Sequence, residues 1–268
     1  MTVKNPQTIF GLIIVMTLLT ACGSNVTETV SSPQGATVAA TAIPATEAPA
    51  TAPGPSPEGE AGSSPTPVPA VNEEPVQTEE QAVISSFSQP VTAGGELLVV
   101  YGHVLDANGA PLSGYAVEIW QVDANGIYDH PGDSNTANRD PGFQSYGTAV
   151  TDANGLFAFR TIVPARYEPR PRHIHFKVKK DGAEVLTSQF YFAGDVDAAQ
   201  LGSGGEMLLL DPSDAHDAGG NAVKLAFKDI VVDTGTGGNL TLTPAQTEGP
   251  YYPVIDVAAF DNDLASVQ

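Results

Sequence analysis

The tetrapeptide Asp-Ala-Asn-Gly occurs three times in this chain of 268 residues, at 106–109, 123–126 and 152–155. Each copy adjoins a β-rich run, and Asn-Gly supplies the positive φ that tight hairpins require. The copies have too few acidic residues, at the wrong spacing, to be EF-hand calcium loops. No segment shows sustained helical periodicity, and strands are expected at 97–104, 115–122, 145–151, 156–161, 172–180, 185–192, 206–210 and 222–233. Short strands separated by turns predict an all-β fold, a β-sandwich of mostly antiparallel strands over residues 83–240.

The first 82 residues differ in composition from the rest. Residues 9–19 form an apolar run that is too short to cross a membrane and typical of a signal peptide, and it ends in Leu19-Thr20-Ala21-Cys22. This ending resembles the lipobox of bacterial lipoproteins, which implies removal of residues 1–21 and lipidation of Cys22. The alternative is an ordinary signal peptide followed by an unrelated cysteine. Residues 22–82 are dominated by Ala, Thr, Pro, Ser and Glu, which predicts a disordered tether. We therefore expect an exported protein, lipid-anchored to the cell membrane with its domain outside the cytoplasm.

Charge and cysteine content exclude several kinds of site. With a formal net charge of -20, nothing in the chain replaces the counterions of a nucleic acid, so nucleic-acid binding is excluded. Cys22 is the only cysteine, which excludes an intrachain disulfide and a thiolate metal site. Seven of the eleven Lys and Arg residues lie within 160–180. We interpret Lys177, Lys179 and Lys180 as a solvated face, and Arg170 as a functional residue.

The segment 172–178, Arg-His-Ile-His-Phe-Lys-Val, alternates polar and apolar residues and predicts a strand with one buried face. Ile174, Phe176 and Val178 would point into the core, while His173 and His175 share the opposite face. Their Cα atoms would be about 6.5–7 Å apart, so both imidazoles could reach one metal ion. A His-x-His pair alone is weak evidence for a metal, because ordinary packing produces it as well.

Further motifs surround this strand in a fixed order. They are the run 114–128 containing Val-Glu-Ile-Trp-Gln-Val-Asp-Ala-Asn-Gly-Ile-Tyr, the run 151–164, the pattern Tyr167-x-x-Arg170-x-x-His173-Ile174-His175-Phe176, and Gln189-Phe190-Tyr191-Phe192 followed by Gly194-Asp195. Over roughly residues 95–235 they resemble the intradiol ring-cleavage dioxygenases, with a core similar to the protocatechuate 3,4-dioxygenase type.

The resemblance implies a mononuclear non-haem Fe(III) ion held by Tyr128, Tyr167, His173 and His175. Phenolate oxygens stabilise the ferric state, and imidazole suits iron. The implied substrates are a catechol and O2, and the implied reaction cleaves the ring between the two hydroxyl-bearing carbons to give a muconate-type diacid. In this scheme Tyr167 accepts a substrate proton, Arg170 stabilises negative charge on the ring, and Gln189 lies next to the metal.

Two features depart from the family pattern. Glu168-Pro169 stands where members often have Pro-Gly, so the turn that follows the Tyr167 ligand differs in sequence from that of the family. The segment 242–252, which contains Glu-Gly-Pro-Tyr-Tyr, resembles one that members carry before the sandwich, whereas here it follows it. We expect residues 241–268 to line the active site, with Gly249, Pro250 and Tyr251 contacting the substrate. Whether they do so within one chain or in a neighbouring subunit of an oligomer is left open by the sequence.

Two other functions fit parts of the sequence. A non-catalytic, lipid-anchored β-sandwich that binds a partner or a surface sugar would have the same composition, with the ligand set retained by descent. A zinc hydrolase using His173 and His175 is disfavoured, because zinc sites prefer His, Cys and carboxylate ligands to tyrosines.

Overall fold

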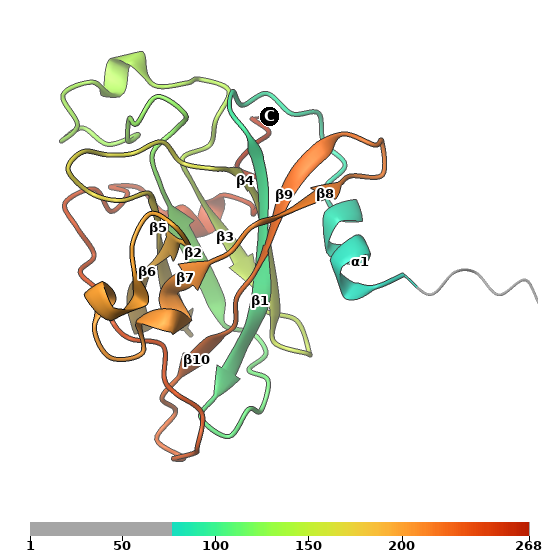
Figure 1. Ribbon diagram of the computed structural model, residues 1–268, viewed down its shortest axis with the longest axis vertical. Helices are drawn as coiled ribbons and strands as arrows, with labels where there is room; N and C mark the ends of the chain where they lie inside the picture. Colours follow the sequence, from blue (N-terminus) through green and yellow to red (C-terminus); the bar gives the residue numbers. More distant parts are fainter. Residues whose placement is uncertain (1–76, 268) are drawn as a thin grey trace, which may run out of the picture. The chain divides into compact units, whose positions relative to one another are not determined.

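Two five-stranded sheets form the folded part of the chain, for which a computed structural model describes residues 77–267 (Figure 1). The first has the order β10-β1-β9-β8, with β4 also paired to β1, and consists of β1 (Leu97–Asp106), β4 (Leu156–Ile162), β8 (Ser213–His216), β9 (Ala222–Phe227) and β10 (Ile230–Val232). The second has the order β3-β2-β5-β6-β7 and consists of β2 (Ala116–Trp120), β3 (Tyr146–Val150), β5 (His173–Lys180), β6 (Ala183–Phe192) and β7 (Leu209–Leu210). The all-β prediction is confirmed.

Most pairings are antiparallel, as expected, but β1 pairs in parallel with both β9 and β10, and β6 with β7. The predicted strand at 206–210 is largely a 3-10 helix (Gly205–Leu208), and β8 was not predicted. The predicted strand at 222–233 is two strands, interrupted at Lys228 and Asp229. The interruption occurs where the Lys228 carbonyl lies against Gly102, a residue with no side chain to obstruct it.

The core lies between the two sheets and consists of the inward-facing residues of both. Alternation along β5 is as predicted, since Ile174, Phe176 and Val178 are fully buried in this core. The rings of Phe176 and Phe190 stack there with their centroids 4.3 Å apart. Along β5 these core residues alternate with His173, His175 and Lys177, which therefore lie on the outer face of the second sheet.

A short helix, α1 (Glu79–Ser85), covers the outer face of the first sheet (Figure 1). Its Val83 and Ile84 are 4% and 3% exposed and pack with Val99, Tyr101 and other side chains of β1 and β9. The helix begins inside the segment 22–82 that we assigned to the disordered tether, so that boundary was wrong by at least four residues. The helix begins where the Thr78 hydroxyl accepts a hydrogen bond from the Gln81 amide. No helix within residues 77–267 has the length and apolar character to span a membrane.

The three Asp-Ala-Asn-Gly copies form turns, as predicted, and they share one hydrogen-bonding pattern. In each copy one carboxylate oxygen of the aspartate accepts from the backbone N–H groups two and four residues later, at 2.8–3.0 Å. The three glycines have φ between +76° and +83°, which only glycine adopts without strain. The carboxylates of Asp106, Asp123 and Asp152 are therefore occupied by the backbone.

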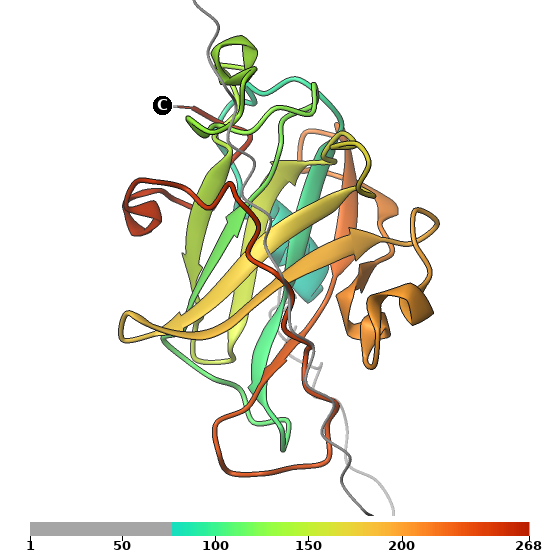
Figure 2. The ribbon, with the colours of Figure 1, turned by 90° about the vertical axis from the view of Figure 1, so that its left-hand side faces the viewer.

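The chain after β10 crosses the outer face of the second sheet (Figure 2). We call residues 243–252 the C-terminal strap. The Gln246 amide donates to the Thr187 carbonyl of β6, and the Pro244 carbonyl accepts from the Ser188 hydroxyl at 2.6 Å. Beyond the strap a 3-10 helix (Val257–Ala259) follows, and Leu264 and Ala265 are fully buried. The remaining 3-10 helices are Thr136–Asn138 and Ala198–Leu201.

Candidate active site

The two histidines of β5 present neutral imidazoles on one buried face. His173 and His175 are 3% and 2% exposed, with ring centroids 4.8 Å apart. Burial lowers the pKa of His173 to about 4 and that of His175 to about 2, so both rings are uncharged near neutral pH. His173 Nδ1 lies 2.8 Å from the Pro171 carbonyl oxygen, which only accepts, so Nδ1 carries the proton and Nε2 presents a lone pair.

Tyr128 brings a phenol oxygen to both of these nitrogens. Its Oη lies 3.1 Å from His173 Nε2 and 3.2 Å from His175 Nε2. The side chain is 3% exposed, and burial raises the pKa of the phenol. The following loop holds the Tyr128 backbone in place, because Asp133 Oδ2 accepts from the Tyr128 amide at 3.0 Å and the Thr136 hydroxyl donates to the Tyr128 carbonyl at 2.9 Å. Three of the four predicted metal ligands therefore meet at one point.

Tyr167, the fourth predicted ligand, adjoins this point and contacts the C-terminal strap. Its ring centroid lies 5.4 Å from that of Tyr128, and its Oη is 2.8 Å from Tyr251 Oη. The hydrogen bond to Tyr251, together with burial, raises the pKa of Tyr167 to about 12. The Arg170 amide donates to the Tyr167 carbonyl at 2.9 Å, so the sequence Glu168-Pro169 forms a turn between these two residues.

Arg170 is fixed by a set of hydrogen bonds on the same face of the sheet. Its Nη2 donates to Gln189 Oε1 at 2.5 Å and to Tyr191 Oη at 3.1 Å, while Nη1 lies 3.4 Å from His173 Nε2. Tyr191 Oη also donates to Gln189 Oε1 at 3.1 Å. Gln189 is oriented in turn by the strap, since its Nε2 donates to the Thr247 carbonyl at 2.5 Å. The guanidinium therefore has one defined orientation toward the His173 side of the site.

The strap of the same chain lies directly on His175. A Cβ added to Gly249 would be 3.2 Å from His175 Cε1, which shows how closely the backbone approaches the ring. On its other side, His175 stacks on Trp120 with centroids 4.8 Å apart and planes 8° apart. Tyr251 packs on Tyr128 with ring centroids 4.8 Å apart, whereas Pro250 is exposed. The strap thus reaches the site of its own chain, which is one of the two arrangements that the sequence left open.

The interpretation of the lysines on β5 as a solvated face was wrong for two of the three. Lys177 is 5% exposed, and its Nζ lies 2.5 Å from Glu248 Oε2 and 3.1 Å from Glu184 Oε2. Lys179 Nζ lies 2.6 Å from Oε1 of Glu118, a carboxylate that is almost fully buried. The strap covers this face, and a strand pattern shows which side chains share a face but not what covers it.

The donor set fits a ferric ion. Two neutral imidazole nitrogens and a phenol oxygen converge in a buried position, a second phenol adjoins them, and phenolate oxygens stabilise Fe(III). Within residues 77–267 no group of three or more His, Cys, Asp or Glu side chains could hold a metal.

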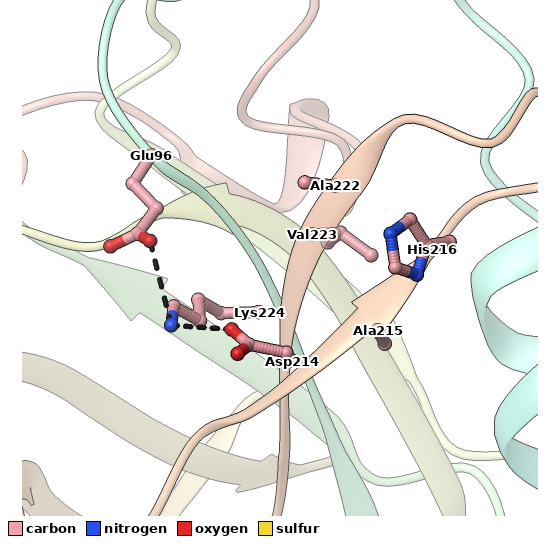
Figure 3. Close-up of a pocket in the computed structure, with 7 residues that line it drawn as sticks. All are labelled: Glu96, Asp214, Ala215, His216, Ala222, Val223 and Lys224. Atoms are coloured by element: carbon pink, nitrogen blue, oxygen red, sulfur yellow. Dashed lines mark hydrogen bonds and ion pairs between the residues drawn. The ribbon is translucent and has the colours of Figure 1, made fainter.

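A separate cavity of about 340 Å³ lies on the first sheet, along the hairpin of β8 and β9 (Figure 3). Lys224 Nζ joins Asp214 Oδ1 at 2.6 Å and Glu96 Oε1 at 3.6 Å in its wall. None of the predicted site residues lines this cavity.

Known proteins that are similar to this chain are dioxygenases. A family model described as Dioxygenase matches residues 69–234, more than half of the chain. The protocatechuate 3,4-dioxygenase beta chain of Burkholderia cepacia is 44% identical over 110 residues, which cover 38% of this chain and 46% of that protein. The catechol 1,2-dioxygenase of Acinetobacter baylyi is 34% identical over 119 residues, which cover 38% of this chain and 37% of that protein. The chain thus matches less than half the length of each of these relatives.

Among solved structures, the dioxygenase domain of a dioxygenase carbohydrate-binding protein fusion from Streptomyces sp. SirexAA-E is similar. It has 33% sequence identity and a TM-score of 0.43, over 53% of this chain and 82% of that one.

Proposed function

The chain belongs to the intradiol ring-cleavage dioxygenase family, and on this premise we propose that it binds one Fe(III) ion and cleaves a catechol with O2. The bond between the two hydroxyl-bearing carbons breaks, both atoms of O2 enter the product, and a muconate-type diacid forms without any external reductant. The observation that carries the proposal is the approach of Tyr128 Oη to within 3.1 Å and 3.2 Å of His173 Nε2 and His175 Nε2.

The ion would be held by Tyr128, Tyr167, His173 and His175. When bound, it would make a catechol held through both oxygens reactive toward O2. The chain's own contribution is a buried, preformed set of donors: both histidines are neutral, and Trp120 and Pro171 fix the orientations of His175 and His173. Residues that orient the ligands in this way commonly raise metal affinity.

Tyr167 is suited to accept a substrate proton. As a phenolate, its oxygen would be a base for a catechol hydroxyl. Its partner Tyr251 lies on the strap, so the proton that Tyr167 takes can be shared with a hydroxyl 2.8 Å away.

Arg170 supplies a permanent positive charge beside the histidines. Its hydrogen bonds to Gln189 and Tyr191 leave Nη1 directed to the metal side of His173. A guanidinium fixed in advance stabilises negative charge that develops on a substrate ring, and no reorganisation is needed at the moment of reaction. Gly249 and Tyr251 present a close backbone and a flat aromatic face on which the ring would bind.

The test is aerobic incubation of the iron-loaded protein with a panel of catechols, with and without a ring carboxylate, following muconate formation by absorbance. We expect stoichiometric iron, a visible tyrosinate-to-iron absorption band and consumption of one O2 for each ring cleaved. A colourless protein that takes up no iron and cleaves no catechol would support the non-catalytic binding module instead.

We also propose that the protein is exported and lipid-anchored through Cys22, which lies outside the described residues. The lipobox-like ending of the apolar run supports this proposal. Expression of the full chain in a bacterium fed labelled palmitate should label the wild type and leave Cys22→Ser unlabelled. Equal labelling of the two would exclude the anchor at this position.

A further inference from the structure

We propose that Lys177 is a positioning residue of the active site: by pairing with Glu248 it holds the C-terminal strap against Gln189 and His175 and so fixes Arg170. The proposal rests on the ring-cleavage function proposed above and adds a residue that the ligand set and the motifs do not contain. Lys177 is not one of the candidate ligands, and it would act through the strap.

Lys177 belongs to the same row of side chains as the histidines. Successive residues of a strand point to opposite faces, so His173, His175 and Lys177 stand side by side on the outer face of β5. A lysine that is 5% exposed keeps its charge only if it is paired. Three groups meet its ammonium: Glu248 at 2.5 Å, Glu184 at 3.1 Å, and the Tyr252 ring, whose centroid is 4.1 Å from Nζ.

Two of these three partners, Glu248 and Tyr252, lie on the strap at either end of residues 249–251. The neighbours of Glu248 in the chain are Thr247, whose carbonyl accepts from Gln189, and Gly249, which lies on His175. One ammonium ion therefore fixes a short piece of backbone from both sides. The amide of Gln189 has its orientation set by the Thr247 carbonyl, and its oxygen then receives Arg170 Nη2.

The consequence for the reaction follows from this sequence of contacts. If the ammonium is removed, Glu248 loses its ion pair at the sheet. The strap is then loosened on the C-terminal side of Gln246, whose amide still bonds to β6, and the Thr247 carbonyl holds the Gln189 nitrogen less firmly. Gln189 is then able to rotate, and Arg170 loses the acceptor that orients it. Misplacement of a catalytic group by about 1 Å can cost about 10²-fold in rate.

The experiment compares Lys177→Met with Lys224→Met in the full-length, iron-loaded protein. Lys224 provides a matched control: it also forms two ion pairs on a β-strand, with Asp214 and Glu96, but in the other sheet and away from the strap (Figure 3). We expect Lys177→Met to retain its iron and to lose about 10- to 100-fold in kcat/KM for its best catechol. Lys224→Met should keep the wild-type value, and Lys177→Arg, which preserves the charge, should recover most of the loss.

A second measurement reports on the strap without depending on activity. Trp120 is the only tryptophan in the chain, and its ring contacts Tyr252 of the strap edge-on, with centroids 5.0 Å apart. Release of the strap should make Trp120 fluorescence more accessible to acrylamide in Lys177→Met and not in Lys224→Met. Glu248→Gln, a milder change at a partly exposed residue, should move both measurements in the same direction.

Equal kcat/KM and equal quenching in Lys177→Met and Lys224→Met would overturn the proposal. So would a Lys177→Met protein that fails to fold together with a Glu248→Gln protein of full activity. If the iron-loaded wild type cleaves no catechol, the proposed function fails, and the quenching contrast still decides whether Lys177 holds the strap.

Discussion

Replacing Gly249 with Ala tests the contact between the strap and His175 by adding a single methyl group. Deleting residues 242–268 would be less informative, because it also removes Leu264 and Ala265 from the interior. Gly249 has a φ of +80°, where a residue with a side chain is strained by about 1–2 kcal/mol. The new methyl would also meet His175 Cε1 at 3.2 Å, and Trp120 stacked behind the ring prevents it from retreating. Overpacking of this kind costs about 1–3 kcal/mol in addition.

Gly220→Ala separates these two effects. Gly220 has nearly the same φ, +79°, but an added Cβ would have no heavy atom within 4 Å. It should therefore lose only the strain energy. The unfolding free energy of Gly249→Ala should be lower than that of the control by about 1–3 kcal/mol. For a domain of this size that corresponds to a melting temperature about 2–12 °C lower.

The assay is thermal unfolding of both variants, with kcat/KM for the best catechol measured on the same samples. If the strap moves aside instead of straining the fold, the temperature gap shrinks and kcat/KM of Gly249→Ala falls, while the control keeps the wild-type value. Two variants with the same melting temperature and the same kcat/KM would refute the packing of Gly249 on His175.

Four further outcomes follow from the same contacts. His175→Ala should take up far less iron per chain than wild type by metal analysis, because one of three converging donors is lost. Arg170→Ala should keep its iron and its colour but lose about 10²–10³ in kcat, since the charge acts only during the reaction. Chelation should abolish colour and activity together, and added Fe(III) but not Zn(II) should restore both. A chain starting at residue 77 should be as stable to urea as the full chain. One starting at residue 86 loses the burial of Val83 and Ile84, about 1.5–3 kcal/mol for each as an upper estimate.

The local pattern of the sequence predicted those parts of the fold that depend on a few neighbouring residues. Alternation along 172–178 assigned Ile174, Phe176 and Val178 to the core and the histidines to the other face. The Asn-Gly turns followed from the positive φ that their glycines adopt. The helix α1 could not be predicted in this way, because it has seven residues and buries only two of them. Its stability comes from packing on β1 and β9, and a segment this short shows no periodicity.

The site was predictable as a set of residues but not as an arrangement in space. The resemblance supplied Tyr128, Tyr167, His173 and His175, and the structure places the Tyr128 oxygen against both histidines and the Tyr167 ring beside that of Tyr128. Pairing of β1 with β9 and β10 depends on partners more than a hundred residues away, so nothing local specifies it. The role of Lys177 was missed for the same reason, since its partner Glu248 is 71 residues further along the chain. The sequence does show that Lys177 shares one face of the strand with the two histidines, and this was the available indication of its role.

The strap lies near the end of the chain, so it is synthesised after the residues that it covers. A ribosome completes the two histidines of β5 about seventy residues before it reaches Glu248, and Asp263, which pairs with Arg160 across 103 residues, comes later still. Every strand of the second sheet ends before the strap begins, so in a chain that stops before residue 243 no strap covers His175 and Trp120. The site is therefore closed only after translation is nearly finished, and any chain that terminates early leaves its candidate ligands uncovered.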